Sequence, residues 1–375
     1  MSEIVTANGS LLSLDLSATD REIFMAIRNQ SGLSRVEISK VLSLSKGAVS
    51  KALAKLQEAG LVDEEREKPG PRHSGQPMIR IRMRPDAMRF IGLNLSTRGA
   101  YVAVSNLASE AVWNSPCYPL EPSRDGIVAQ AVELIREAKR NAGGTDIGMF
   151  VPAIFSASED ILEVTPKQAS IPYHEIRQEL VAQFPQSSVV VSSRADIMQS
   201  ALRPEMFGKV LFLVSFSDGV GGHIFDRNRV IRGGYNQAGN IGGMVPETGP
   251  RPSVTDLADM LGCDPLELDP GRLEELFDAG HKPLMDWIES RGATLSEPLS
   301  AVVQLLNPQT IVLGGNFPNP VLSALRQHID LSVYDVPTRM PLSKPDIVIS
   351  DVLGEASRAT ASAILPLAKY LSYLD

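Results

Sequence analysis

The sequence predicts an α/β protein in which a small, mostly helical head precedes a larger body. Within residues 20–58, three short stretches have apolar residues at helical spacing, separated by capping and turn residues. From residue 90 onward, strands alternate with amphipathic helices, as in 90–106 followed by 126–140. Two glycine-punctuated hairpins of similar build, near 94–98 and 217–222, predict a body duplicated into two lobes with a cleft between them.

Length and composition predict a cytoplasmic protein of two or three domains. The chain has 375 residues, of which 43% are hydrophobic and 21% charged, as in ordinary soluble proteins. The sequence shows no secretory signal pattern and no run approaching ~18 apolar residues. Cys117 and Cys263 are far apart in the chain, so we expect buried free thiols rather than a disulfide or a metal cluster.

Charge is distributed unevenly along the chain, although the formal net charge is −8. Residues 1–90 have 14 Lys and Arg against 11 Asp and Glu, whereas the remainder has 22 against 33. A mildly basic head on an acidic body is typical of a protein in which one domain meets phosphate and the other does not.

The first two helices of the head are predicted over residues 20–29 and from Arg35 onward. SRVE at 34–37 fits a capping box, in which the Ser34 hydroxyl accepts from the Glu37 amide while the Glu37 carboxylate reaches back to the Ser34 amide. A tight turn follows at 42–44. The predicted apolar stripe of the second helix consists of Ile38, Val41 and Leu42.

A third helix, predicted over 46–58, has an outer face of small and basic residues without an acid. Such a face fits the major groove of DNA, because small residues permit close approach, lysines reach phosphates and serine reaches base edges or phosphates. With two short helices and a turn before it, this helix predicts a helix-turn-helix. The DNA-binding residues predicted on these helices are Ser34, Arg35, Ser45, Lys46, Gly47, Ser50, Lys51 and Lys55.

A β-hairpin wing is predicted after the third helix. Residues 60–62 end the helix and begin a strand, 70–77 form a turn-rich tip, and IRIRMR at 79–84 alternates apolar residues with arginine. Arg72 and His73 near the tip are further DNA-binding candidates. The alternative is a helical domain with a solvated basic face, but helix order, caps, outer face and wing together favour DNA binding.

The body is predicted to continue with further strands and a closing helix. A helix is expected over 195–203, and a strand at 346–354 precedes a closing helix that can return to the first lobe. The remaining strands are predicted at 147–155, 188–193 and 310–317, and residues 209–225 are predicted to form a strand, a glycine loop and a second strand.

The chain as a whole resembles the transcriptional regulators of the ROK family (repressors, open reading frames and sugar kinases). The head resembles that family's winged helix through residues 34–62 and the wing turn SGQP. The resemblance implies a winged helix-turn-helix followed by a two-lobed actin-like, sugar-kinase-like body. The body segments that carry the resemblance are 91–106, SDGVGG at 217–222, GGYNQAGNIGG at 233–243 and IVLGGN at 311–316.

Three units follow from the resemblance. Residues 1–86 would form the winged helix-turn-helix, and 87–203 with 352–375 the first α/β lobe. Residues 204–351 would form a helix-rich second lobe that serves dimerisation, as in relatives.

Residues that family kinases need for catalysis are missing. The acid of their first hairpin turn is replaced by Asn94, and the residues matching their Asn-Asp pair are Ser193 and Arg194. Arginine stays protonated and cannot act as general base, whose loss costs ~10²–10⁴ in rate. We therefore expect no kinase activity, no catalytic residues and no cofactor.

The family's zinc ligands are also missing. Sugar-binding members have GEIGH where this chain has GNIGG at 239–243, so Asn240 replaces the glutamate and Gly243 replaces the zinc-binding histidine. The cysteine cluster that follows in relatives is absent, and Thr255 lies near the position of a downstream glutamate. The sequence thus predicts no zinc site of the family kind.

The cleft either binds a changed ligand or binds nothing. Arg194 can clamp a carboxylate or phosphate, but the alternative is a structural pair with Asp196 or Asp218. Asn236 and Asn240 are either ligands or turn formers, and glycines 219, 221 and 222 are read as retained turn geometry. The candidate effector-pocket residues are Asn94, Ser193, Arg194, Asp218, Asn236, Asn240 and Thr255.

These observations predict a DNA-binding transcriptional regulator, a repressor acting as a homodimer or homotetramer on a palindromic operator of double-stranded DNA. A sugar-derived or anionic metabolite is the expected effector. The alternatives are a sugar kinase with a DNA-binding head and a constitutive DNA-binding protein whose body is only a scaffold.

Overall fold

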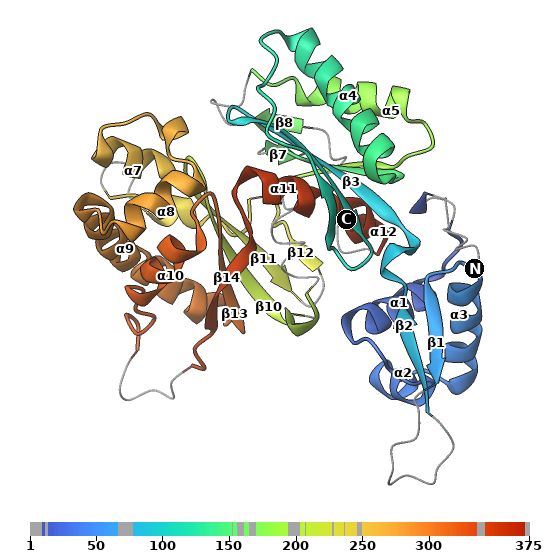
Figure 1. Ribbon diagram of the computed structural model, residues 1–375. Coiled ribbons are helices and arrows are strands. Elements are labelled where there is room, and N and C mark those ends of the chain that lie inside the picture. Colours follow the sequence, from blue (N-terminus) through green and yellow to red (C-terminus); the bar gives the residue numbers. More distant parts are fainter. Residues whose placement is uncertain are drawn as a thin grey trace.

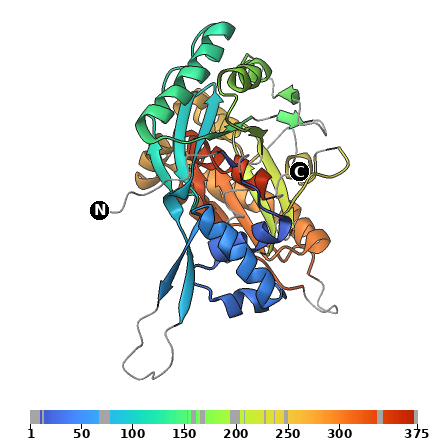
Figure 2. The same ribbon diagram turned by 90° about the vertical axis from the view of Figure 1, so that its right-hand side faces the viewer.

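The computed structural model has a head and two lobes (Figures 1 and 2). It describes residues 10–11, 14–66, 78–151, 153–155, 161–164, 170–193, 203–206, 208–226, 229–235, 237–245, 250–335 and 342–371. None of the helices in these segments is both long and apolar enough to cross a membrane.

The head consists of three helices and a two-stranded antiparallel wing. The helices are α1 (Ala18–Asn29), α2 (Arg35–Val41) and α3 (Lys46–Glu58). The wing pairs β1 (Val62–Arg66) with β2 (Ile79–Met83), in the order predicted from the sequence. Helix α3 has the predicted limits and buries its predicted inner face.

Helix α2 confirms one prediction and corrects another. Both halves of the capping box are present, with the Ser34 side chain accepting from the Glu37 amide and the Glu37 carboxylate accepting from the Ser34 amide. The apolar stripe is wrong at Val41, which is 57% exposed, because this short helix buries only Ile38. Ser43, with φ of 53°, makes the tight turn before α3.

The sheet of the first lobe has the strand order β5-β4-β3-β6-β9. The β3–β4–β5 part is antiparallel, whereas β6 and β9 extend the sheet from β3 in parallel. These strands are β3 (Arg89–Ser96), β4 (Gly99–Asn106), β5 (Ala111–Asn114), β6 (Asp146–Phe150) and β9 (Val189–Ser192). Helices α4 (Arg124–Ala142) and α5 (Tyr173–Gln183) cover one face.

The second lobe repeats this topology with the order β12-β11-β10-β13-β14. The strands are β10 (Val210–Phe216), β11 (Val220–Asp226), β12 (Arg229–Ile231), β13 (Thr310–Gly315) and β14 (Asp346–Leu353). An antiparallel hairpin and edge strand are again extended by two parallel strands, so the predicted duplication is confirmed. The helices of this lobe are α7 (Val254–Leu261), α8 (Pro270–Asp278), α9 (Lys282–Leu306) and α10 (Asn319–Gln327).

Two local predictions need correction. The strand expected over 147–155 is interrupted, because β6 ends at Phe150 and β7 (Ala153–Phe155) instead pairs with β8 (Ile161–Val164) in a separate sheet. Cys117 is exposed rather than buried, and Cys263 is partly buried. The helix predicted over 195–203 falls almost entirely outside the described residues. Short 3-10 helices occur at Pro85–Ala87, Pro204–Met206, Ile241–Met244 and Pro265–Glu267.

The closing helices return to the first lobe, as predicted. Helix α11 (Gly354–Ser362) packs on the sheet face opposite α4, and α12 (Leu365–Tyr370) follows it toward the head (Figure 1). The contact is close because the sheet presents glycine there. A Cβ at Gly92 would lie 1.8 Å from the carbonyl oxygen of Ala359, and one at Gly148 would lie 1.7 Å from that of Ser362.

Head and first lobe share one continuous apolar core, which includes Ile27 of α1 and Leu367 of α12. Tyr370, at the end of α12, donates from its hydroxyl to the Leu14 carbonyl at 3.0 Å. Arg21 of α1 donates to the Tyr370 carbonyl at 2.9 Å and lies 4.5 Å from the centroid of its ring. The head is therefore docked firmly on the body through the C-terminal helix.

Replacing Gly148 by alanine is expected to destabilise the protein by about 3 kcal/mol, because the new methyl group would overlap α11 backbone that cannot retreat without leaving the sheet. Chemical denaturation followed by far-UV circular dichroism measures the change. Gly219→Ala is the control, since a Cβ there meets nothing within 4 Å, and it should stay within about 0.5 kcal/mol. Equal stability of the two variants would contradict the packing of α11 described above.

Candidate nucleic-acid interface and interlobe site

The start of α3 presents the predicted DNA-facing residues to solvent. Ser45 caps the helix, accepting from the Ala48 amide at 3.2 Å, and the first turn contains no acid. A helix N-terminus whose partial positive charge is not balanced by an acidic side chain attracts phosphate. The exposed residues of this surface are Ser45, Lys46, Gly47, Ser50 and Lys51.

Arg35 connects this surface to the wing. Its guanidinium donates to the Ser50 hydroxyl at 3.2 Å and pairs with Glu64 of β1. The predicted contact Ser34 has its hydroxyl occupied as the cap of α2. Arg35 is thus placed beside the recognition surface but is held there by a carboxylate.

Lys55 is engaged within the head. Its ammonium lies 3.3 Å from the carboxylate of Asp20 on α1. Burial acts to raise the pKa of Asp20, but hydrogen bonds from Ser17 and the Lys55 charge outweigh it and lower that pKa. Lys55 therefore stabilises the packing of α1 against α3, and DNA would have to compete with Asp20 for it.

The arginines of IRIRMR are paired with acids, which their alternation with apolar residues did not reveal. Each of the three has an acidic partner, and with Arg35 of α2 these pairs occupy all three acids of the consecutive run Asp63–Glu65 on β1. The pairs are Arg80 with Glu37 at 2.9 Å, Arg82 with Glu65, Arg84 with Asp63 at 3.4 Å, and Arg35 with Glu64. The wing-tip candidates Arg72 and His73 lie outside the described residues.

The carboxylate of Glu355 lies between the lobes, at the centre of a hydrogen-bond network. Glu355 on α11 accepts from the side-chain amide of Asn94 at 2.7 Å and from that of Asn316 at 3.2 Å. Arg358, one turn further along α11, donates to the same carboxylate at 3.0 Å. Asn94 also donates to the Glu355 carbonyl at 2.9 Å. Asn94 therefore holds α11 rather than facing an open cleft.

The Glu355 carboxylate in this cluster is ionised, but hydrogen-bond donors already occupy both of its oxygens. Burial acts to raise the pKa of Glu355, but the Arg358 charge and the hydrogen bonds from Asn94 and Asn316 outweigh it, so the pKa is lowered. Both carboxylate oxygens already accept donors, and Arg358 also stacks 4.8 Å from the Phe150 ring. Such a carboxylate is poorly suited to act as a general base or to hold a metal-bound nucleotide.

A second link between the lobes is made by Arg98, which sequence reasoning missed. It lies in the β3–β4 turn and donates to the Pro265 carbonyl of the second lobe at 2.7 Å. Its guanidinium also faces Asp218 of the β10–β11 turn at 3.9 Å. The predicted effector residue Asp218 thus faces Arg98. Arg194, its proposed partner, lies outside the described residues.

Two of the glycines of GNIGG, Gly239 and Gly242, lie against the backbone of β11. A Cβ at Gly239 would lie 2.7 Å from the Gly222 carbonyl oxygen, and one at Gly242 would lie 2.3 Å from that of Val220. Only glycine permits this approach of the loop to β11, and Gly239 also has φ of +92°. Asn240 is exposed at the start of the following 3-10 helix.

The other predicted effector residues are dispersed. Thr255 lies in the first turn of α7, whose first amide donates to the Ser217 carbonyl at 2.9 Å. Ser193 is partly buried after β9, and Asn236 lies outside the described residues. The hollow between α4 and α5 and the hollow between the lobes are lined by other described residues.

An ionic cluster fastens the GNIGG loop to α7 and α9. Asp256 on α7 accepts from Arg291 at 2.7 and 3.0 Å and from the Trp287 indole at 2.6 Å. Arg251 donates to the carbonyl of Gly242 at 3.1 Å, which ties the GNIGG loop to the start of α7. No three His, Cys, Asp or Glu side chains of the described residues are grouped so that they could hold a metal ion.

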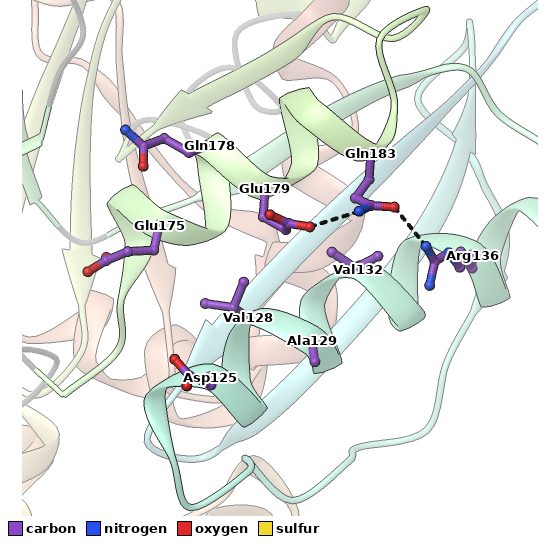
Figure 3. Close-up of a pocket in the computed structure, with 9 residues that line it drawn as sticks. All are labelled: Asp125, Val128, Ala129, Val132, Arg136, Glu175, Gln178, Glu179 and Gln183. Atoms are coloured by element: carbon purple, nitrogen blue, oxygen red, sulfur yellow. Dashed lines mark hydrogen bonds between the residues drawn. The ribbon is translucent and has the colours of Figure 1, made fainter.

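Three surface hollows formed by described residues are large enough to hold a small molecule or peptide. One, of about 460 Å³, lies between α4 and α5, where Val128, Ala129 and Val132 form an apolar floor under a polar rim (Figure 3). The second, of about 440 Å³, lies between the lobes beside Arg98, Asn316 and Glu355. The third, of about 470 Å³, lies at the base of the wing and is lined by residues 82–87 with Asp63 and Glu65.

The head and the whole chain resemble known DNA-binding proteins. The MarR family matches residues 14–72. The chain is 24% identical over 340 residues to the uncharacterized protein y4fQ of Sinorhizobium fredii, covering 87% of this chain and 85% of that protein. It is 23% identical over 328 residues to the DNA-binding transcriptional repressor Mlc of Escherichia coli, covering 78% of this chain and 79% of the repressor.

Solved structures establish the fold. A ROK family transcriptional regulator, a homolog of the E. coli MLC protein, matches with a TM-score of 0.67 at 18% identity, covering 94% of this chain and 96% of that one. A ROK family glucokinase from Streptomyces griseus, in complex with glucose and AMPPNP, matches with a TM-score of 0.59 at 14% identity, covering 74% of this chain and 99% of the kinase. The fold is a helix-turn-helix head on a sugar-kinase-like body.

Replacing Asp256 by asparagine is expected to lower the free energy of unfolding by about 2–3 kcal/mol, because four hydrogen bonds to a partly buried charge are weakened. Urea denaturation measures this loss. Asp286→Asn is the matched control, since Asp286 is the exposed partner of Lys282 within α9 and should change stability by no more than about 0.5 kcal/mol. Similar losses in both variants would refute the fastening role of Asp256.

Proposed function

We propose that this protein, whose fold and whole-length similarity are those of ROK-family transcriptional regulators, is a DNA-binding transcriptional regulator and acts as a repressor. The observation that carries the proposal is the exposed start of α3, which combines small residues, two lysines and an uncompensated helix N-terminus. The MarR-type match over residues 14–72 covers this surface.

In this proposal α3 enters the major groove with its first turns. Lys46 and Lys51 neutralise phosphates, while Ser50 reaches base edges, and Gly47 permits close approach. Arg35 joins them after exchanging Glu64 for a phosphate. Because Arg80, Arg82 and Arg84 are already paired with acids, sequence-independent attraction of DNA to the wing is moderate, and contacts concentrate on α3 and the wing tip.

The proposed assembly is a homodimer or homotetramer. Residues 204–351 supply the dimerisation lobe, 87–203 with 352–375 the first lobe, and 1–86 the DNA-binding domain. A two-fold axis would place two recognition helices about 34 Å apart, one turn of DNA, so the operator is palindromic.

The body is proposed to sense rather than to catalyse. Asn94 carries no ionisable acid, and the neighbouring Glu355 carboxylate is occupied by Asn94, Asn316 and Arg358. Ser193 offers no general base at pH 7. These residues argue against the sugar-kinase alternative, although kinases share the fold of the body.

A physical route exists from the cleft to the head. Helix α11 carries Glu355 at the lobe junction, and α12 continues to Tyr370, which bonds Leu14 and Arg21 beside the head. A ligand that changes the spacing of the lobes would therefore bias the placement of the recognition helices. This route favours a regulated protein over a constitutive binder with a scaffold body.

The double variant Ser50→Ala with Lys51→Ala is expected to lose about 1–3 kcal/mol of operator binding free energy with an unchanged melting temperature, because both side chains are exposed. The slope of log K against log salt should fall by about 1 for the lost phosphate contact. Fluorescence anisotropy with a labelled operator measures both. Lys282→Ala, on the second lobe, is the control, and unchanged affinity in the double variant would reject α3 as the recognition helix.

Glu64→Gln is expected to strengthen DNA binding several-fold, because Arg35 no longer has to leave a carboxylate before it meets a phosphate. The salt dependence should become steeper in the same titration. Glu22→Gln makes the same charge change at an exposed position on α1. An equal gain in that control would assign the effect to net charge and not to Arg35.

A further inference from the structure

The guanidinium of Arg35 connects the recognition helix to the wing through Ser50. Its Nη1 atom donates to the Ser50 hydroxyl at 3.2 Å, and its Nη2 atom pairs with Glu64 of β1. Arg35 is the first residue of α2, so side chains from α2, α3 and β1 meet at this guanidinium. A planar group with fixed donors is well suited to hold a neighbouring side chain in one orientation.

The hydrogen bond from Arg35 determines what the Ser50 hydroxyl offers to a partner. A serine hydroxyl has one proton to donate and accepts through its lone pairs. Ser362 on α11 shows what a helical serine can do with that proton, because its hydroxyl donates to the Arg358 carbonyl one turn back at 2.7 Å. Ser50 makes no such bond, and among the described residues its exposed hydroxyl accepts from Arg35 and donates to none. The Ser50 proton is therefore available to an acceptor outside the protein.

Gly47 allows such an acceptor to come close to Ser50. A Cβ added at Gly47 would meet only the Ser45 hydroxyl oxygen, 4.0 Å away, outside its own helical turn, and its φ is not in the left-handed region. The fold would accept alanine here, and alanine is the better helix former. Because position 47 lies one turn before Ser50 on the exposed face, the missing side chain leaves room for a base edge beside the short serine.

A single outward proton distinguishes among the base edges of the major groove. Purine N7, guanine O6 and thymine O4 are acceptors there, whereas cytosine presents only its N4 donor. N7 is the acceptor that both purines share, and one donor cannot make the bidentate contacts that separate guanine from adenine. A hydroxyl that donates to N7 therefore reads a purine against a pyrimidine without choosing between the two purines.

We propose that Ser50 is a specificity-determining residue, whose hydroxyl donates to N7 of one purine in each operator half-site. Arg35 is a positioning residue. Its Nη1 atom keeps the Ser50 proton directed at the base, while its Nη2 atom exchanges Glu64 for a phosphate. The inference deepens the proposed function and rests on it, since it requires α3 to be the recognition helix.

The test uses 7-deazapurines, in which a C–H group replaces N7 while base pairing is retained. An operator is first selected from a randomised pool of duplexes with the full-length chain. Each purine of one half-site is then replaced in turn, and fluorescence anisotropy measures the affinity. At one position we expect a loss of about fivefold, as for one net hydrogen bond, and exchange of adenine and guanine there should change affinity less than twofold.

Two variants and one control assign the contact. Ser50→Ala is expected to bind the unmodified operator about fivefold more weakly per half-site, and to lose nothing further when N7 of that purine is removed. Arg35→Gln should reduce the effect of the 7-deazapurine to less than twofold, because the Ser50 proton is no longer held in place. Lys51→Ala is the control, since an exposed lysine contacts phosphate. It should weaken binding to all duplexes alike and keep the fivefold effect.

Three results would overturn the inference. They are insensitivity to N7 at every purine, a fivefold loss that persists in Ser50→Ala, and a loss in Arg35→Gln as large as in the wild type. An unchanged melting temperature, expected because these side chains are accessible to solvent, shows that the variants fold. A wild-type chain that binds its selected operator but ignores N7 rejects this inference alone, whereas a chain that enriches no duplex rejects the proposed function as well.

Discussion

The structure depends on one buried carboxylate, Glu355, placed where the two lobes and the closing helix meet. It bonds Asn94 from the first lobe and Asn316 from the second, and it is neutralised by Arg358 on its own helix. Removing any one of these partners would leave a buried charge or a buried polar group without its hydrogen bond. The resulting loss of folding free energy would far exceed the net stability that the intact interaction contributes. The relative position of the lobes is therefore coupled to α11, and α12 extends that coupling to the head through Tyr370.

Several residues of this sugar-kinase-like body serve packing and hydrogen bonding. Gly239 and Gly242 of the GNIGG loop lie too close to the backbone of β11 for any side chain. Asp256 and Arg291 hold α7 against α9, and Asn94 bonds the start of α11.

The sequence was sufficient to predict the features that depend on residues close together in the chain. The limits of α3, the capping box of α2 and the two similar hairpins follow from spacing and from residues within a few positions of one another. The partner of Asn94 was beyond it, because Glu355 lies 261 positions further along the chain and stands in no recognisable motif. Local spacing did not predict the features that depend on tertiary contacts. These are the exposure of Val41 and the pairing of the wing arginines with acids.

In the proposed function, the head reads a two-fold symmetric DNA sequence, and this reading distinguishes a dimeric regulator from other DNA-binding proteins. It is tested most directly by selecting bound duplexes from a randomised library with the purified full-length chain and sequencing the recovered pool. The account predicts enrichment of an inverted repeat whose half-sites are one helical turn, about 10 base pairs, or a multiple of it apart. A pool that stays as random as the input, or that yields only a single unrepeated half-site, would contradict it.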